Sequence, residues 1–541
     1  MPQLPFSIMR FRGPQTDDDV WPGTFEVLKQ YRACCDEVWL STGIGIPTLE
    51  SHRKQAANCA RAAADLRSAG ILPGLQFQAT LGHGDSIANN NNEDTSGKHW
   101  GGFTGADGTE CRYCSCPRQP EFLAYLEEVS RLYAAWHPSS VWIDDDLRLN
   151  NHSPVMEPFC YCDRCLDDFA KVEGKRYARE ALYSAIKTDS ALLDRWEAFQ
   201  FTSLAEIART IAAAFHAVSP ETMMGYQHCH WPNASLTKIY RALFEASGHP
   251  VGSRPGGGAY YDNDPWEQLS KAYFQAYIKN SLRPAADIIA MTCPEIETWP
   301  RTFSCRNGQS LAFESLINLA QGCDSLSYFI MAPRFETPEW YGKKLLSRLC
   351  AEMPLYKEFV EYNRGAVPCG IRVDTEEQDW YHWKITGERA PHFRVTMGLP
   401  LVCGEGMICA NLSEIEKALP PDILDLERAN TARILQVHQV ADKLSAGRMP
   451  VKLESAGRVV IMPMADKDGT LRSVTVLNPT IDVMDEVRLR LRGVPENAQT
   501  AEWRSLGGAE PVRMPLTRDG RDALLTVPDL AAWNAGWMRF R

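Results

Sequence analysis

Short apolar runs alternate with longer amphipathic stretches through roughly the first 350 residues of the chain. The apolar runs have the length of β-strands, and they lie at 6–11, 37–42, 74–80, 140–145, 222–227, 252–257, 294–298 and 325–330. Between them, apolar positions recur with helical spacing, as at 52–70, 120–136 and 309–322. This alternation is typical of β/α units that build a parallel sheet. Eight such units predict an α/β fold in which a (β/α)₈ TIM barrel occupies residues 1–355.

Polar residues gather at the carboxyl ends of these predicted strands, where barrels of this kind carry their chemistry. They include His83, Asp144 to Arg148, His228, His230, Arg254, Glu295, Glu297 and Glu336. The long segment 81–119 is rich in Gly, Asn and Asp and exceeds an ordinary barrel connection, so we expect a functional loop over the barrel mouth.

The pattern changes after the barrel. Shorter units predict a small α/β domain over 356–447, similar in kind to a trimerisation domain. From about residue 450, alternating apolar and polar positions separated by turn residues predict a small antiparallel β-domain over 448–541.

Composition narrows the class of protein. The 541 residues carry 57 basic and 68 acidic side chains, a net charge of −11, without a Lys/Arg run, so we expect no nucleic-acid partner. No uninterrupted apolar run approaches the roughly 18 residues of a membrane span, and the N-terminus lacks a signal-peptide pattern. Seventeen cysteines without such a signal indicate mostly reduced thiols in a cytoplasmic protein.

Cysteines cluster at two places in the chain. Cys160, Cys162 and Cys165 form C-x-C-x₂-C, and Cys111, Cys114 and Cys116 lie upstream. Thiolates this close in a reducing compartment favour a tetrahedral zinc ion over disulfides, and four thiolates would close the site to water, which makes the zinc structural. Cys116 is the favoured fourth ligand because a helix begins just after it; Cys111 and Cys114 are the alternatives. The competing interpretation is a set of reduced surface thiols or adventitious disulfides.

Acidic side chains follow the fourth strand and lie within the seventh. A barrel places these strand ends across the mouth from each other, so one carboxyl group from each could flank a glycosidic bond. Strand alternation puts Asp144 and Asp146 on one face and Asp145 on the other. We therefore expect Asp146 or Asp144 as acid/base and Glu297 as nucleophile, with Glu295 behind it. The competing interpretation of the Asp triplet is a solvated loop or a cation site.

Other residues near the strand ends suit sugar recognition. Arg148 is expected to hold a neighbouring carboxylate ionised, and Arg254 to contact a hydroxyl or carboxylate of the substrate. Planar aromatic rings pack on the apolar faces of sugars, and imidazoles bind hydroxyls. The remaining candidates for substrate contact are Trp142, Tyr260, Trp299, His83, His228 and His230. Histidines could instead hold a catalytic metal.

This combination resembles glycoside hydrolase family 42, the β-galactosidases of the retaining (β/α)₈ clan. In that family one cysteine after strand 3 joins a cysteine cluster after strand 4 to bind structural zinc, which matches Cys116 with "CYCDRC" at 160–165. The order of the three domains is similar, and "LAQGCDSLSYFIMAPRFETPEW" (319–340) is similar to the strand 8 region, which implies a substrate contact for Glu336. The family's nucleophile corresponds to Glu297 in "PEIETWP". The Asn-Glu pair of the clan is replaced here by "DDD".

These observations predict a retaining β-glycosidase that hydrolyses a small glycoside or oligosaccharide, contains structural zinc, requires no organic cofactor and assembles as a dimer or trimer. The alternatives are an inverting or mechanistically distinct sugar hydrolase or lyase on the same barrel, a non-catalytic carbohydrate-binding barrel, and a zinc hydrolase that uses the histidines.

Overall fold

The computed structural model describes residues 4–11, 13–229, 235–258, 260, 265–298, 306–334, 336–373, 380–387, 398–403, 406–419, 431–455 and 457–541. The candidate residues His230 and Trp299 lie outside these described residues. Within the described part, no helix combines the length and the apolar character needed to cross a membrane.

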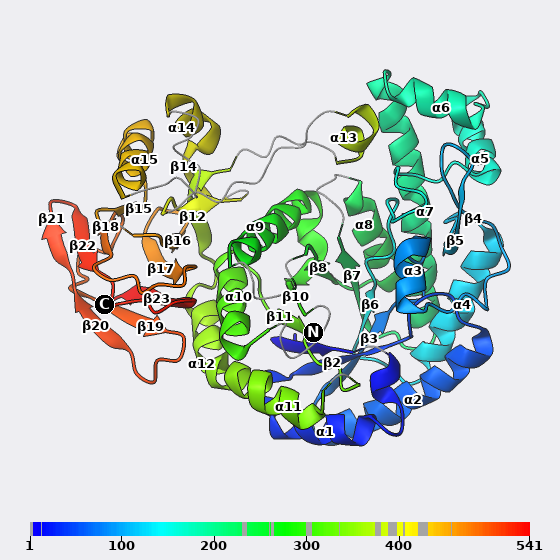
Figure 1. The fold of residues 1–541 in the computed structure, drawn as a ribbon, viewed down its shortest axis with the longest axis horizontal. Helices are drawn as coiled ribbons and strands as arrows, with labels where there is room; N and C mark the ends of the chain where they lie inside the picture. Colours follow the sequence, from blue (N-terminus) through cyan, green and yellow to red (C-terminus); the bar gives the residue numbers. More distant parts are fainter. Residues whose placement is uncertain are drawn as a thin grey trace.

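The N-terminal part is a barrel of parallel strands (Figure 1). Its strands are β1 (Ser7–Arg10), β2 (Glu37–Ser41), β3 (Leu72–Phe77), β6 (Ser140–Ile143), β7 (Met223–His228), β8 (Val251–Pro255), β9 (Ile289–Thr292), β10 (Glu295–Glu297) and β11 (Leu326–Phe329). They follow one another in the order β10-β11-β1-β2-β3-β6-β7-β8-β9. All eight predicted strands are present, which confirms the predicted barrel.

The seventh stave of the barrel is split into two strands. β9 pairs with β8 on one side, and β10 pairs with β11 on the other. Only Cys293 and Pro294 separate β9 from β10. Proline has no backbone N–H and interrupts a ladder of hydrogen bonds. The two halves of this stave therefore form the two ends of the strand order, and the second half carries both candidate glutamates.

Amphipathic helices surround the strands (Figure 1). They include α1 (Trp21–Gln30), α2 (Leu49–Ser68), α4 (Pro120–Ala134), α7 (Ser190–His216), α8 (Leu236–Ser247), α9 (Pro265–Ser281), α10 (Gly308–Ala320) and α12 (Ser347–Tyr362). Local sequence fixes several of their starts: Thr48 accepts the Ser51 N–H at 3.2 Å, and Asn307 accepts the Ser310 N–H at 3.0 Å. Such side chains satisfy backbone donors that a helix leaves unpaired at its N-terminus.

Large side chains fill the barrel interior below the mouth. The indole rings of Trp39 and Trp142 stack with centroids 4.4 Å apart, and both are fully buried. A Cβ atom at Gly252 would lie 2.2 Å from the Trp142 ring, and one at Gly225 would lie 2.5 Å from it, so only glycine fits beside this indole. Trp142 is therefore part of the barrel core, and the structure does not bring it to a sugar as the sequence analysis expected.

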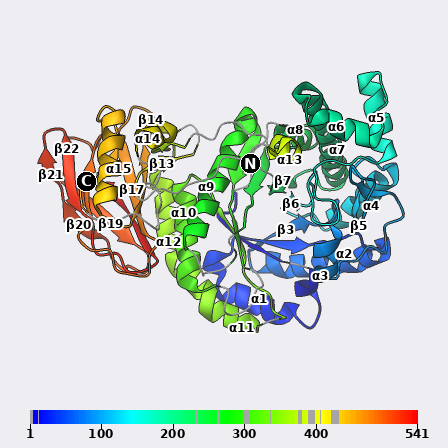
Figure 2. The same cartoon turned by 45° about the horizontal axis from the view of Figure 1, so that its top comes forward.

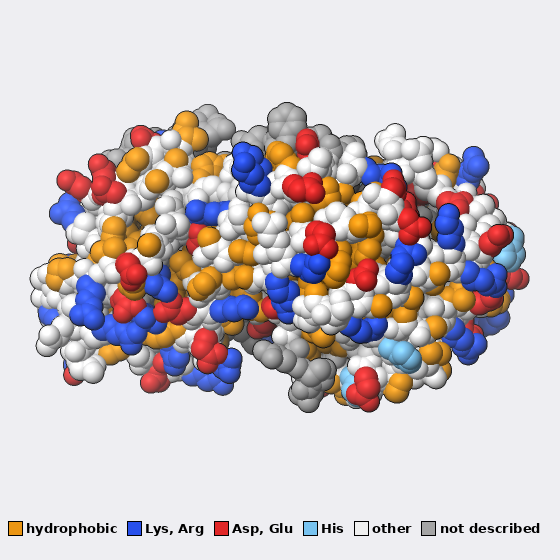
Figure 3. Space-filling view, turned by 90° about the horizontal axis from the view of Figure 1, so that it is seen from below, with side chains coloured by type: hydrophobic (Ala, Val, Ile, Leu, Met, Phe, Trp, Pro, Cys, Tyr) orange, Lys and Arg blue, Asp and Glu red, His pale blue; other side chains and the backbone are white. Residues whose placement is uncertain are grey.

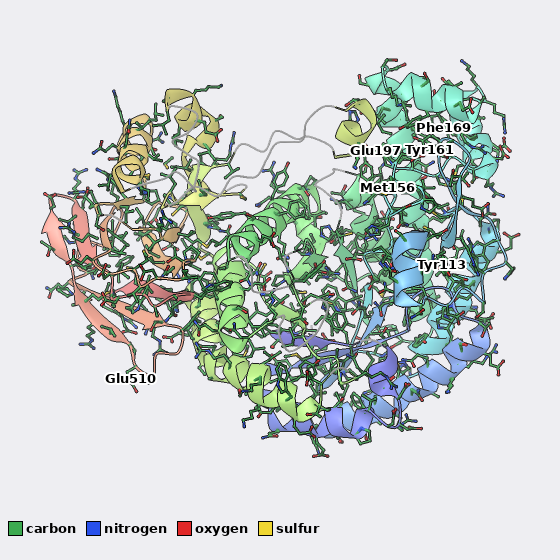
Figure 4. The ribbon with its side chains drawn as sticks, viewed as in Figure 1. Tyr113, Met156, Tyr161, Phe169, Glu197 and Glu510 are labelled. Atoms are coloured by element: carbon green, nitrogen blue, oxygen red, sulfur yellow. The ribbon has the colours of Figure 1, made fainter. Side chains whose placement is uncertain are left out.

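The long segment after β3 has its own secondary structure. It forms the helix α3 (Asp85–Asn91) and an antiparallel hairpin of β4 (Gly102–Thr104) and β5 (Glu110–Ser115). A carboxylate oxygen of Asp85 accepts the backbone N–H of Tyr113 at 3.1 Å, which ties α3 to the hairpin (Figure 4). The Tyr161 N–H donates to the Thr104 carbonyl at 2.7 Å, which joins the hairpin to the segment before α5 (Asp163–Glu173). A further short helix, α6 (Arg179–Ile186), precedes α7.

Two further sheets follow the barrel and lie to one side of it (Figure 2). In the first, β12 (Val367–Arg372) pairs in parallel with β13 (Leu401–Val402) and β14 (Met407–Asn411), and antiparallel with β16 (Val460–Ala465). The sheet continues through β17 (Leu471–Asn478), β23 (Asn534–Phe540), β19 (Thr500–Ser505) and β20 (Val512–Pro515). The two regions predicted as separate domains on either side of residue 447 thus share one sheet.

The second sheet is antiparallel and completes the C-terminal part. It consists of β15 (Val451–Leu453), β18 (Arg488–Leu491), β22 (Asp522–Thr526) and β21 (Thr517–Asp519). A second hydrophobic cluster, containing Val474, Leu489 and Trp503, lies between the two sheets. The predicted antiparallel C-terminal sheets are confirmed. The helices α14 (Leu412–Ala418) and α15 (Thr431–Leu444) cover this part.

The surface of the whole molecule is mixed in charge. On the face shown in Figure 3, acidic and basic side chains are interspersed.

Candidate active site

The aspartate triplet lies in a turn that begins where β6 ends. The strand stops at Ile143, and the backbone N–H of Leu147 donates to the Asp144 carbonyl at 3.1 Å. Side chains alternate between faces only while a strand continues. The expected pairing of Asp144 with Asp146 on one face therefore does not apply, and each aspartate has a different environment.

Arg254 connects the fourth and seventh staves. Its Nη1 donates to Glu295 Oε1 at 2.6 Å, and its Nη2 donates to Asp145 Oδ2 at 3.3 Å. The Arg254 side chain is 2% exposed, so these charge-assisted contacts are shielded from water. The carboxylates that the sequence placed on opposite staves thus lie on one guanidinium group, and Asp145, not Asp146, makes the connection.

Glu295 is held by donors on several sides. Besides Arg254, its Oε2 accepts the Gly257 N–H at 3.0 Å and the Tyr260 hydroxyl at 3.4 Å. Burial acts to raise the pKa of Glu295, but the positive charges of Arg254, Lys271 and Arg10 outweigh it and lower the pKa. Glu295 is therefore an ionised and fixed carboxylate.

Glu297 is the more accessible of the two glutamates. Its side chain is 14% exposed against 4% for Glu295, and its Oε2 lies 3.1 Å from Arg10 Nη2. Gln227 Oε1 accepts from Arg10 Nη1 at 3.2 Å and from Arg254 Nη2 at 3.0 Å. One amide oxygen thus links the arginine beside Glu297 to the arginine beside Glu295.

Arg10 and Gln227 were missed in the sequence analysis. Both are polar residues inside apolar strand sequences, "SIMR" and "MMGYQH", and both are buried. A buried polar side chain requires partners. Their position near the strand ends was the signal that could have assigned them to the site.

Asp144 and Asp145 contact each other, but their pKa values are shifted in opposite directions. Burial raises the pKa of Asp144 to about 7, and repulsion from Asp145 and Asp146 adds to the effect, although Gln76 donates to its Oδ2 at 2.6 Å. Burial would also raise the pKa of Asp145, but Arg254, Arg148 and His83 lower it to about 2. At neutral pH the pair therefore combines a carboxyl group near its midpoint with a carboxylate.

Asp146 is sealed away from the mouth. It is fully buried, and its Oδ1 lies 2.9 Å from His83 Nε2 and 3.3 Å from Arg148 Nη2. His83 Nδ1 lies 2.7 Å from Glu93 Oε1. Burial acts to lower the pKa of His83, but Asp146 and Glu93 outweigh it and raise the pKa to about 10. His83 is thus an imidazolium ion between two buried carboxylates, rather than a neutral group for binding hydroxyls.

The remaining candidates lie in different environments. His228 is fully buried, with its Nε2 3.4 Å from Ser253 Oγ and its ring stacked on Tyr226. Arg148 donates to Cys229 Sγ at 2.9 Å and lies 3.8 Å from Asp145. Glu336 is half-buried after β11, where its backbone N–H reaches the Ala332 carbonyl at 3.5 Å.

Four thiols meet beside the hairpin and could hold a metal ion. The Sγ atoms of Cys116, Cys160, Cys162 and Cys165 all lie within 4.8 Å of one another. Cys116 Sγ is 3.4 Å from that of Cys162 and 3.7 Å from that of Cys165. Tetrahedral zinc with bonds of about 2.3 Å separates its sulfur ligands by about 3.8 Å, which these distances match. Cys111 and Cys114, the alternatives for the fourth ligand, are not in this group.

Aromatic rings of the segment that carries three of the thiols pack against Trp196 of α7. Trp196 lies 5.5 Å from Tyr161 and 4.8 Å from Phe169, measured between ring centroids, and Figure 4 shows the latter two near Glu197. Cys162 is the N-cap residue of α5, so Cys165 follows in its first turn. The cluster thus fastens the hairpin to the start of α5.

Comparisons with known proteins identify the fold. No family model matches the sequence, and no curated protein matches it. The structure is similar to that of a β-galactosidase from Bacillus circulans sp. alkalophilus, with 11% identity, 99% of both chains covered and a TM-score of 0.58. It is also similar to an α-L-fucosidase from Paenibacillus thiaminolyticus, with 10% identity, 99% and 100% coverage and a TM-score of 0.56.

A third similar structure belongs to the family named in the sequence analysis. It is a family 42 β-galactosidase from G. stearothermophilus, with 10% identity, 100% and 99% coverage and a TM-score of 0.55. The similarity extends over the barrel and both following sheets. This chain has the barrel fold of these solved structures. The predicted distant resemblance to family 42 is confirmed at the level of that fold.

Proposed function

We propose that the protein is a retaining β-glycosidase that hydrolyses small β-galactoside-like substrates. The observation that carries the proposal is the guanidinium of Arg254, which contacts Asp145 of the fourth stave and Glu295 of the seventh. This contact supports a meeting of the two acidic segments, in which Asp144 and Glu297 lie beside the two residues that Arg254 holds. Two carboxyl groups on either side of one glycosidic bond are what such hydrolysis requires. The similar solved structures, which include β-galactosidases, add support through the shared fold.

Asp144 is the acid/base in this proposal. A general acid must hold its proton near neutral pH, and the pKa of Asp144 is raised to about 7 by burial. Asp145, with its pKa lowered to about 2, remains ionised and keeps the proton on its neighbour. Asp146, buried between His83 and Arg148, anchors the turn that presents the other two.

Glu297 is the nucleophile. It has the more exposed carboxylate of the seventh stave, 14% against 4% for Glu295, whereas Glu295 is held by Arg254, Gly257 and Tyr260. Glu297 attacks the anomeric carbon while Asp144 protonates the departing oxygen. Water then attacks the glycosyl-enzyme, gives its proton to Asp144 and releases Glu297.

The test is hydrolysis of a panel of aryl β-glycosides by wild-type protein and by two variants. Glu297→Gln should lose at least about 1,000-fold in kcat on every substrate. Asp144→Asn should lose most of its kcat/KM on substrates with poor leaving groups but little on dinitrophenyl glycosides, because a good leaving group needs no proton in the first step. Its kcat should fall on both, because the attack of water on the glycosyl-enzyme still needs the base. Glu339→Gln, on the exposed start of α11 (Pro338–Tyr341), is the matched control.

Three outcomes would contradict the proposal. An α-anomer as first product by NMR would indicate inversion of configuration. Equal activity of wild type and Glu297→Gln would indicate a barrel whose carboxylates do not react. Loss of activity on mild chelation would favour metal-dependent hydrolysis.

We also propose that the four-thiol cluster binds one structural zinc ion. Support comes from the Sγ separations and from the burial of the cluster, which leaves no open coordination position for a substrate. The zinc would supply no step of the reaction. Assembly as a homo-oligomer and a cytoplasmic location are further parts of the proposal that rest on the sequence.

A further inference from the structure

A second group of thiols lies far from the four-thiol cluster, where the first and last parts of the barrel meet. Cys34 ends the short helix η2 (Arg32–Cys34), which precedes β2, and Cys350 lies in the first turn of α12. Both thiols reach the carbonyl oxygen of Tyr31, Cys34 at 3.3 Å and Cys350 at 3.4 Å. Two sulfurs from opposite ends of the barrel sequence therefore occupy one small space.

The backbone around these thiols is closely packed. A Cβ atom at Gly342 would lie 2.5 Å from the Tyr31 ring, so the segment leading into α12 approaches Tyr31 more closely than any side chain would allow. Cys34 Sγ also lies 3.8 Å from the Leu346 carbonyl oxygen, one turn before Cys350. Because both segments are fixed, the two thiols remain neighbours, and a disulfide would require their sulfurs to close to about 2.05 Å.

The two thiols differ in access and in acidity. Cys34 is fully buried, whereas Cys350 is half-buried. The neighbouring Cys350 thiol and burial raise the pKa of Cys34, whereas interaction with Cys34 lowers the pKa of Cys350. The thiolate is the form that attacks disulfides. Cys350 is therefore suited to react first with a reagent from solution, and Cys34 to react second.

We propose that Cys34 and Cys350 form a reversible dithiol–disulfide pair that exchanges with low-molecular-weight disulfides. The Cys350 thiolate attacks one sulfur of the small disulfide, whose S–S bond breaks and releases one thiol. Cys34 then attacks Cys350 Sγ, which forms the Cys34–Cys350 bond and breaks the mixed disulfide, and the Cys34 proton passes to the departing sulfur, which leaves as the second thiol. The protein loses two electrons, and the small disulfide gains them as two thiols.

The resulting bond would join η2 to the helix that carries the C-terminal sheets. Glu352 of α12 accepts the Gly507 N–H at 2.7 Å, and Glu358 of the same helix lies 2.5 Å from Arg504 Nη2 and 2.7 Å from Arg539 Nη1. Cys350 thus lies on the element that contacts both the barrel and the C-terminal part. This site is independent of the barrel mouth and of the proposed hydrolysis.

The test treats the full-length protein with glutathione disulfide, followed by non-reducing digestion and mass spectrometry. Wild-type protein should yield a peptide pair joined through Cys34 and Cys350, lighter by two hydrogen atoms than the reduced peptides and separated by dithiothreitol. Cys350→Ser, at a half-buried position, should abolish the link and leave Cys34 unmodified. In Cys34→Ala, the reaction should stop at the mixed disulfide between Cys350 and glutathione.

Cys229→Ser is the matched control, because Cys229 is also half-buried but lies at the barrel mouth. This variant should form the link to the same extent as wild type. Wild-type protein whose Cys350 stays unmodified or carries only glutathione would overturn the proposal. So would a link through Cys35, whose thiol reaches the Glu37 carbonyl at 3.9 Å.

Discussion

Adjacent aspartates at the barrel mouth have different protonation states because their neighbours differ. Asp144 lies against Gln76 and two other carboxyl groups, and Asp145 lies against Arg254 and Arg148. Repulsion and burial favour a neutral carboxyl in the first case, and attraction to two cations favours an ionised one in the second. The triplet therefore supplies both an acid and a fixed negative charge.

The pKa of Asp144 sets the expected pH dependence of hydrolysis. With a pKa raised to about 7, the general acid is protonated below that pH and ionised above it, so kcat should fall as pH rises through about 7. On substrates with poor leaving groups, Asp144→Asn should lose this decline along with most of its activity, and on a dinitrophenyl glycoside, whose departure needs no acid, neither protein should show it. Profiles of kcat from pH 5 to 9 for both proteins on both substrate types test this, and an unchanged alkaline decline in the variant would contradict it.

The raised pKa of His83 also makes the stability of the folded protein depend on pH. Its pKa is raised to about 10 by Asp146 and Glu93 against the opposing effect of burial, whereas an unfolded histidine titrates near 6.5. Between these values the folded protein keeps a proton that the unfolded chain releases. The stabilisation is thus complete below about pH 6.5 and is lost as pH rises to about 10.

Replacing His83 with Gln should therefore flatten the fall in unfolding free energy between pH 6.5 and 10, by about 2 kcal/mol or more. Urea unfolding at several pH values measures this difference. His99→Gln, at an exposed position in the same segment, is the control and should retain the wild-type slope. If the unfolding free energy of His83→Gln falls with pH as steeply as that of wild type, a protonated His83 does not contribute to stability.

The sequence predicted correctly which residues meet when those residues lie close together along the chain. The spacing of Cys160, Cys162 and Cys165 brings three thiols onto one turn, and the helix after the hairpin directed attention to Cys116. It failed for Asp145, because the contact with Arg254 depends on where β6 stops and on the register of a distant strand. Alternation continues only as far as the strand does.

At the scale of elements, all eight staves could be predicted from apolar runs, but the division of the seventh could not. Strand β9 was not predicted, and β10 was. Pro294 offers no N–H to the ladder, so hydrogen bonding to β8 ends before it and hydrogen bonding to β11 begins after it. The segment 81–119 was expected as a loop, and its helix and hairpin depend on contacts with residues beyond it.

The thiol cluster is expected to hold these added elements in place. Cys160→Ser should lose the bound zinc and lower the thermal midpoint, because removal of one ligand opens a site that supplies folding energy. Elemental analysis should find about one zinc ion per wild-type chain. Cys111→Ser, which alters a buried thiol outside the cluster, should keep its zinc. Wild-type protein without zinc, or Cys160→Ser with a full complement, would contradict the assignment.

At the scale of the whole molecule, one face of the C-terminal sheet belongs to the barrel core. Val460, Met462 and Trp537 are part of the same hydrophobic cluster as the barrel helices, whereas the other face of the sheet packs in the second cluster. The sequence predicted an antiparallel region but not this division of its faces, because alternation does not reveal which neighbour covers each side. The barrel and the C-terminal part are thus expected to unfold together.

Trp537 tests this coupling. Its fully buried indole lies 5.4 Å from Phe359 and 5.6 Å from Tyr362 of α12, so Trp537→Ala would remove contacts between the two parts and cost about 3–5 kcal/mol. Trp503→Ala removes an indole of the same size from the second cluster only. Calorimetry should find one transition for wild type, two for Trp537→Ala, and one at lower temperature for Trp503→Ala. Identical behaviour of the two variants would mean that α12 does not couple the barrel to the sheets.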